Sequence, residues 1–124
     1  MCSVEVTVKE VLDQWSKVCR LVFLCNSKEC FVEHHSQLFS CDQGDTLRIR
    51  VVESGCEIYR ENATCGADYV MNGKVAQIRG DDSMCIVSCG GLLLKLPQSC
   101  VDIDTKKTLQ VALTRTRGQD CCAS

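Results

Sequence analysis

Cysteine content constrains this chain more than any other feature, because twelve of its 124 residues are cysteines. In a short secreted protein, this density would indicate a scaffold held together by disulfides. The first thirteen residues favour another environment, since they include Glu5, Lys9 and Asp13 and contain no apolar run of signal-peptide length. We therefore expect a reduced, intracellular protein in which most cysteines are small buried hydrophobic residues. A secreted or surface cysteine-rich binding protein, stapled by disulfides, is the alternative.

Size and charge limit the classes of function. The length fits one domain, which we place at residues 1–124. Lys and Arg total 14 against 16 Asp and Glu, which gives a net charge of −2. A protein that binds nucleic acid mainly through phosphates is normally basic, so the overall charge does not by itself indicate nucleic-acid binding. The longest apolar stretch, residues 18–25, is interrupted by Arg20 and is too short to span a bilayer, so we expect no membrane partner.

Alternating apolar and polar residues predict that strands form most of the fold. The clearest case is residues 46–52, in which three aliphatic side chains alternate with Arg48 and Arg50. The five expected strands are residues 17–25, 46–52, 56–60, 69–79 and 84–89. Residues 4–15 mix the two periods and predict a short strand followed by a helical turn. Residues 105–117 fit either period, and the arginines at their end favour a helix.

This order of elements is typical of a small Greek-key barrel, and the OB-fold is the common one at this length. The expected fold is therefore all-β with edge helices, in the form of a five-stranded Greek-key OB-fold barrel. The barrel covers about residues 15–97, and residues 98–124 form a C-terminal segment. In that segment, Leu109, Val111 and Leu113 follow a barrel that is already closed, so we expect them to bind a partner protein.

Two segments carry a resemblance to a known class of proteins, namely residues 69–75 (YVMNGKV) and residues 84–91 (MCIVSCGG). They resemble the last two barrel strands of small eukaryotic OB-fold proteins in genome maintenance. That class includes the single-stranded-DNA-binding subunit of the SOSS complex, the small OB subunit of the BLM helicase complex and the smallest subunit of the CST telomere complex. The resemblance implies a nuclear subunit of a DNA replication, repair or telomere complex. Such a subunit acts through a larger protein partner, and its binding of single-stranded DNA is weak or partner-assisted.

The candidate nucleic-acid site lies on the outer face of the second and third expected strands. There, Arg48 and Arg50 can contact phosphates, and Tyr59 can stack on a base. In the resemblance, Tyr59 takes the position of a base-stacking aromatic, whereas the aromatics expected on later strands are absent. Lys74 and Arg79 extend the basic side. The alternative is a solvated strand face on which an arginine pairs with an acidic residue across the hairpin.

Cysteine and histidine residues between positions 25 and 41 raise the question of a metal site. Cys25, Cys30, His34 and Cys41 belong to a C-x4-C-x3-H-H-x5-C pattern, and thiolates and imidazoles are zinc ligands. The spacing is looser than that of a zinc knuckle, so we expect no cofactor, with zinc at these four residues as the alternative. No nucleophile elbow, phosphate loop or paired-carboxylate motif accompanies the histidines, so we expect no enzymatic activity.

Overall fold

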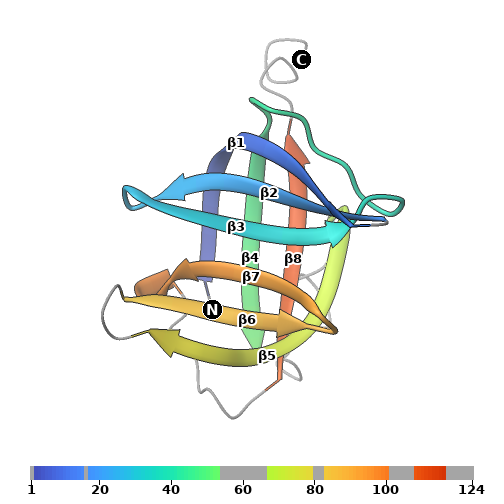
Figure 1. Ribbon diagram of the computed structural model, residues 1–124. Helices are drawn as coiled ribbons and strands as arrows, with labels where there is room; N and C mark the ends of the chain where they lie inside the picture. Colours follow the sequence, from blue (N-terminus) through green and yellow to red (C-terminus); the bar gives the residue numbers. More distant parts are fainter. Residues whose placement is uncertain (1, 16, 54–66, 80–82, 101–107, 117–124) are drawn as a thin grey trace.

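The fold is a closed barrel of eight antiparallel strands (Figure 1). The structure is a computed structural model, and it describes residues 2–15, 17–53, 67–79, 83–100 and 108–116. The strands are β1 (Cys2–Trp15), β2 (Val18–Cys25), β3 (Lys28–His35), β4 (Thr46–Glu53), β5 (Tyr69–Arg79), β6 (Met84–Cys89), β7 (Leu92–Pro97) and β8 (Leu109–Thr116), with a short 3-10 turn, η2 (Gln98–Cys100), after β7. Their order around the barrel is β1-β2-β3-β7-β6-β5-β8-β4, and β4 pairs with β1 to close it. Among these segments, no helix has the length and apolar character needed to cross a membrane.

Two long strands turn the corners of the barrel because each changes its partner midway. Residues 2–7 of β1 pair with β4, whereas residues 8–15 pair with β2. In the same way, residues 69–73 of β5 pair with β8, and residues 74–79 pair with β6. Both strands therefore belong to two sheets, and the sheets close on each other through these bends (Figure 1).

The interior is filled by the inward-facing side chains of all eight strands, as expected for a barrel of this size. The alternation predicted for residues 46–52 is confirmed, because Leu47, Ile49 and Val51 are fully buried while Arg48 and Arg50 are partly exposed. The buried cysteines among the described residues are Cys19, Cys25, Cys30, Cys41, Cys85 and Cys89. Burial raises the pKa of the Cys89 thiol to about 11. A thiol of this kind stays protonated and is a poor nucleophile.

The expected five-stranded OB-fold with edge helices is wrong, because the described residues form eight strands and the one helical element among them is η2. The segment expected to form an N-terminal helical turn is part of strand β1. Its register shifts between Val8 and Glu10 and again between Asp13 and Trp15. Each shift moves the alternation by one residue, so the apolar spacing along a bent strand imitates that of a helix.

A hairpin between β2 and β3 is a second difference from the expected fold. Its two-residue turn is Asn26-Ser27, and both residues have positive φ, at 54° and 64°. This geometry matches the type I′ turn, which usually contains glycine. Because the turn contains no glycine, it is not recognisable as a turn from the sequence, and Lys28–His35 is not predicted as a separate strand. The strand expected at residues 56–60 lies outside the described residues.

The helix expected within residues 105–117 is also wrong, because Leu109–Thr116 forms strand β8 between β4 and β5. Leu109, Val111 and Leu113 are fully buried and fill the chain's own core. These three side chains therefore do not form an exposed surface for a partner. Ala112, between Val111 and Leu113, is also buried, so the apolar residues of β8 do not follow a simple alternation.

Candidate functional site

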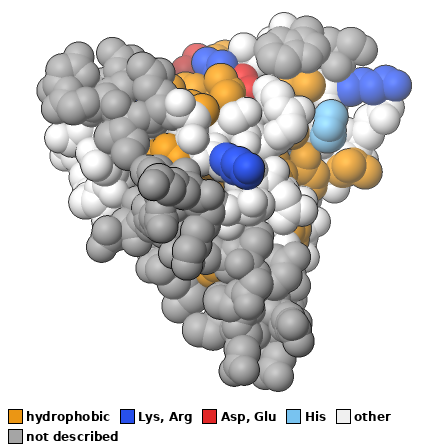
Figure 2. Space-filling model, turned by 90° about the horizontal axis from the view of Figure 1, so that it is seen from below, with side chains coloured by type: hydrophobic (Ala, Val, Ile, Leu, Met, Phe, Trp, Pro, Cys, Tyr) orange, Lys and Arg blue, Asp and Glu red, His pale blue; other side chains and the backbone are white. Residues whose placement is uncertain are grey.

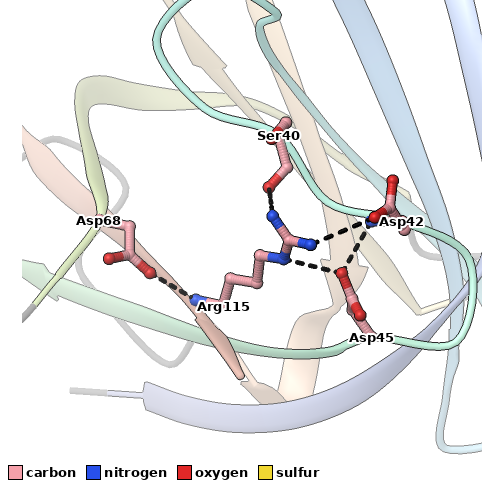
Figure 3. Close-up of polar contacts among 5 residues, drawn as sticks. All are labelled: Ser40, Asp42, Asp45, Asp68 and Arg115. Atoms are coloured by element: carbon pink, nitrogen blue, oxygen red, sulfur yellow. Dashed lines mark hydrogen bonds and ion pairs between the residues drawn. The ribbon is translucent and has the colours of Figure 1, made fainter. Parts of the chain in front are cut away.

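Arg115, near the end of β8, is the centre of the candidate site (Figure 3). Its Nε atom lies 2.8 Å from Asp45 Oδ2, and its Nη2 atom lies 3.2 Å from Asp42 Oδ2. Its Nη1 atom donates to the backbone oxygen of Ser40 at 3.3 Å. The backbone N–H of Arg115 donates to Asp68 Oδ2 at 2.8 Å. One arginine thus joins the loop that follows β3, the residue that precedes β4, and the residue that precedes β5.

Local hydrogen bonds hold the acidic partners of Arg115 in place. The backbone N–H of Asp42 donates to Asp45 Oδ2, and the N–H of Asp45 donates to the carbonyl oxygen of Asp42. Gly44, at φ 93°, turns the chain so that its N–H donates to the carbonyl oxygen of Val8. The N–H of Val8 in turn donates to the carbonyl oxygen of Asp45. The loop is therefore fastened to the bend of β1.

A pocket of about 450 Å³ opens beside this network. We call it the Arg115 pocket, and its lining residues are Ser36, Gln37, Leu38, Phe39, Ser40, Asp68 and Arg115. Phe39 is buried, whereas Leu38 is 69% exposed. The carboxylates of Asp42 and Asp68 are exposed at the site, so the surroundings of the pocket combine apolar surface with negative charge.

An aromatic cluster lies behind Phe39. The ring centroids of Phe39 and His34 are 5.1 Å apart in an edge-to-face arrangement, and Tyr69 is 5.7 Å from Phe39. The Tyr69 hydroxyl accepts a hydrogen bond from the backbone N–H of His35. His34 Nδ1 lies 3.1 Å from the carbonyl oxygen of His35, so Nδ1 is the protonated nitrogen. Among the described side chains, His34 Nε2 is one of two buried polar atoms without a hydrogen-bond partner.

The buried His34 predicts a loss of stability in mild acid. Burial lowers its pKa, with a weaker opposing effect from the His35 carbonyl, so the unfolded chain binds a proton at a higher pH than the folded chain does. Stability therefore falls as the pH drops below about 6.5, at up to about 1.4 kcal/mol per pH unit. Urea unfolding between pH 7.5 and 5.0 measures this slope. The slope should be reduced in His34→Asn. It should be retained in His35→Asn, because the His35 side chain is exposed. Equal slopes in both variants would contradict this role for His34.

The predicted nucleic-acid residues are not gathered into one basic surface. Arg48 and Arg50 share the outer face of β4, and Arg48 Nη2 lies 3.1 Å from Glu5 Oε2 of β1. Lys74 is exposed on β5, which is separated from β4 by β8. In the view of Figure 2, the basic side chains drawn among the described residues are likewise scattered. Arg79 is the last residue of β5.

Tyr59, the expected base-stacking residue, lies outside the described part of the chain. Among the described residues, the acidic partner of Arg48 is Glu5, on β1 rather than across the expected hairpin. This pairing resembles the solvated strand face considered as the alternative to a nucleic-acid site.

The four candidate zinc ligands do not come together. Cys30 and His34 lie four residues apart on β3, which corresponds to about 13 Å along a strand. Cys25 is the last residue of β2, at the turn of the β2–β3 hairpin, whereas His34 lies at the other end of that hairpin. Cys41 lies in the loop after β3. Within the described ranges, no group of three or more His, Cys, Asp or Glu residues could hold a metal ion.

Arg115 and its acidic partners were missed in the sequence, although strand alternation contains a signal for them. Leu109, Val111 and Leu113 point inward, and Arg115 is the next residue of the same series. A charged residue at an inward position near a strand end requires an ionic partner at the mouth of the barrel. Asp45 supplies it, because it precedes β4, whose Leu47 pairs with Arg115.

The lining of the Arg115 pocket combines polar, charged and apolar groups. Its described lining offers hydroxyl, amide, carboxylate and guanidinium groups together with Leu38 and Phe39, and no cysteine or histidine. Cys41 is near but buried, and burial with the negative charge of Asp45 raises its pKa to about 12. The chain matches no protein-family model and no curated protein.

Proposed function

We propose that this chain is an architectural subunit of a larger assembly that acts on DNA in replication, repair or telomere maintenance. In this role it binds a larger protein subunit and has at most weak affinity of its own for single-stranded DNA. The observation that carries the proposal is the Arg115 pocket, where a leucine that is 69% exposed borders a site braced by four polar contacts of Arg115. A rigid surface of this kind suits a protein partner, because little ordering is required on binding.

The resemblance of residues 69–75 and 84–91 to subunits of genome-maintenance complexes supports the same proposal. The near-neutral charge of the chain supports protein contacts over phosphate contacts. Since Arg48 already pairs with Glu5, part of its positive charge is compensated within the barrel. We assign the protein to the nucleus, with secretion as the alternative.

Assembly with a partner can be tested in the cells that encode the chain. A tagged copy at native expression level should sediment with a larger complex on a glycerol gradient, with one dominant partner subunit in fixed stoichiometry. A fluorescent fusion should concentrate in the nucleus. If the chain sediments as a free 13.7-kDa protein, or is recovered from the medium, the proposed function is wrong.

The isolated chain is expected to bind single-stranded DNA with a micromolar or weaker dissociation constant at physiological salt. One stacked base contributes about 1–3 kcal/mol, and few cations are available for phosphate contacts. Reversal of both β4 charges, Arg48→Glu with Arg50→Glu, should abolish this binding. Fluorescence anisotropy of a labelled oligonucleotide across a salt series measures the effect.

A charge-matched control distinguishes a specific face from a change in net charge. Lys9→Glu with Lys28→Glu makes the same charge change on β1 and β3 and should weaken binding less. Adding Glu5→Arg to the β4 variant restores an ion pair opposite position 48, which checks that the barrel still folds. Nanomolar binding that persists in the β4 variant would contradict the expectation.

A further inference from the structure

We infer that the Arg115 pocket holds a short segment of the partner subunit in which an arginine or lysine stands next to an apolar residue. The inference rests on the proposed function for the identity of the partner. It rests on the pocket itself for the chemistry of the segment. Two different properties of the pocket, one apolar and one electrostatic, specify the two side chains.

The apolar property comes from Leu38. The backbone N–H groups of Leu38 and Phe39 both donate to the carbonyl oxygen of His35, at 3.1 Å and 3.2 Å, so the turn is fixed. Within this turn, Phe39 is buried while Leu38 is exposed. Leu38 is more exposed than Val11, Leu24 or Val70, the other exposed large hydrophobic residues of the described chain. An apolar side chain from a partner would remove Leu38 from water without rearranging the loop.

The electrostatic property comes from an excess of carboxylates. Asp42, Asp45 and Asp68 surround Arg115, so three negative groups meet one positive group. Asp45 and Asp42 accept hydrogen bonds from the guanidinium of Arg115, whereas Asp68 accepts a hydrogen bond from the backbone N–H of Arg115. Asp68 forms no ion pair with a described side chain and is exposed in the lining of the pocket. A partner cation beside Asp68 would balance the site, whereas a carboxylate or phosphate would be repelled.

The size of the pocket agrees with a short segment. About 450 Å³ accommodates one or two side chains rather than a whole helix or strand. The lining comes from three parts of the chain, namely the loop after β3, Asp68, and Arg115 of β8. Because Arg115 contacts both of the other parts, the pocket is formed before any partner arrives (Figure 3).

Three synthetic peptides test the inference directly. Each peptide is nine residues long, with glycine and serine on both sides of a central triplet. The triplet is Leu-Arg-Leu, Leu-Glu-Leu or Ser-Arg-Ser. Each is titrated into the full ¹⁵N-labelled chain at physiological salt, and amide shifts report affinities as weak as millimolar. The Leu-Arg-Leu peptide should bind at least tenfold more tightly than Leu-Glu-Leu and at least fivefold more tightly than Ser-Arg-Ser. Its shifts should centre on residues 36–40, Asp68 and Arg115.

Two variants remove one property each and preserve the fold. Leu38→Ser removes an exposed side chain, and Asp68→Asn removes a charge while keeping an oxygen that can accept the Arg115 N–H. Each variant should bind the Leu-Arg-Leu peptide at least fivefold more weakly than the wild-type chain does. Leu24→Ser and Glu29→Gln are matched controls on the β2–β3 hairpin, and they should leave its affinity unchanged.

Several results would overturn the inference. They are undetectable binding of Leu-Arg-Leu, equal binding of Leu-Glu-Leu, or unchanged affinity in both pocket variants. Dimerisation of the wild-type chain that is lost in Leu38→Ser would assign the pocket to a second copy of the chain and would equally overturn it. Sedimentation velocity measures that outcome.

The gradient experiment separates this inference from the proposed function. If the wild-type chain sediments with a larger complex and the combined Leu38→Ser, Asp68→Asn variant does so equally well, the pocket inference fails and the proposed function stands. If the wild-type chain enters no complex, the proposed function fails. The peptide titration then decides the chemistry of the pocket by itself.

Discussion

Replacement of Glu33 by alanine is expected to lower the free energy of unfolding by about 3–5 kcal/mol. Glu33 lies on β3 and its side chain is only 1% exposed. Its Oε2 atom accepts two hydrogen bonds from the guanidinium of Arg20, at 2.7 Å and 3.1 Å. Its Oε1 atom accepts the backbone N–H of Leu93 at 2.9 Å. Alanine leaves the partly buried guanidinium and the Leu93 N–H without this acceptor.

The position of Glu33 explains why the loss should be large. The junction between β3 and β7 contains two paired positions, Phe31 with Lys95 and Val32 with Leu94. Just beyond them, the carboxylate of Glu33 bonds the backbone of β7 and so extends a short ladder. Arg20 also lies over the Phe31 ring, 3.9 Å from its centroid, and is held there by the same carboxylate. Loss of Glu33 therefore weakens the closure of the barrel at this junction.

Urea unfolding at pH 7 measures the effect of Glu33→Ala. Glu33→Gln keeps an oxygen for the Leu93 N–H and should lose only part of the stability, since the charge on Arg20 is then unpaired. Glu29→Ala on the same strand is the matched control, because that carboxylate is exposed and its pair with Lys9 contributes less than about 1 kcal/mol. A loss of under 1 kcal/mol for Glu33→Ala would show that the β3–β7 junction does not depend on the carboxylate.

Local periodicity allowed part of the fold to be predicted. The pairing of distant strands could not be predicted from it. The strands expected at residues 17–25, 46–52, 69–79 and 84–89 correspond to β2, β4, β5 and β6. Each has a clear apolar period or clear turn residues at its ends. The bends of β1 shift the period, and the Asn26-Ser27 turn has left-handed geometry without glycine. These features left too few strands for an eight-stranded barrel and favoured the smaller fold.

The same distinction applies to the candidate site. Strand alternation was enough to place Arg48 on the outer face of β4. Its pairing with Glu5 depends on the β1–β4 register, which joins residues 43 positions apart. The Arg115 network joins positions separated by 47 to 75 residues. Such contacts exist only after the barrel closes, so strand alternation can mark Arg115 as an inward-facing charge on β8 but cannot identify its partners.

Replacement of Gly73 by alanine is expected to lower the free energy of unfolding by more than about 3 kcal/mol. Gly73 lies where β5 changes its partner from β8 to β6. A Cβ atom at this position would lie 2.6 Å from Cys89 Sγ and closer still to the carbonyl oxygen of Ser88. The oxygen belongs to the backbone of β6, so the strands must separate to make room for a methyl group.

Chemical denaturation of Gly73→Ala and of matched variants tests whether space or conformation sets the cost. Gly90→Ala is the first control, because Gly90 has φ 61° and a Cβ atom there would meet nothing within 4 Å. Its cost is that of a left-handed alanine, about 1 kcal/mol. The second control adds Cys89→Ala to Gly73→Ala, which removes the sulfur but leaves the Ser88 carbonyl in place. This double variant should stay destabilised, because the close approach of the β6 backbone at the bend requires a residue without a side chain. Recovery of wild-type stability would instead assign the cost to the sulfur contact and would contradict the role of Gly73 as the point at which the strands of the two sheets meet.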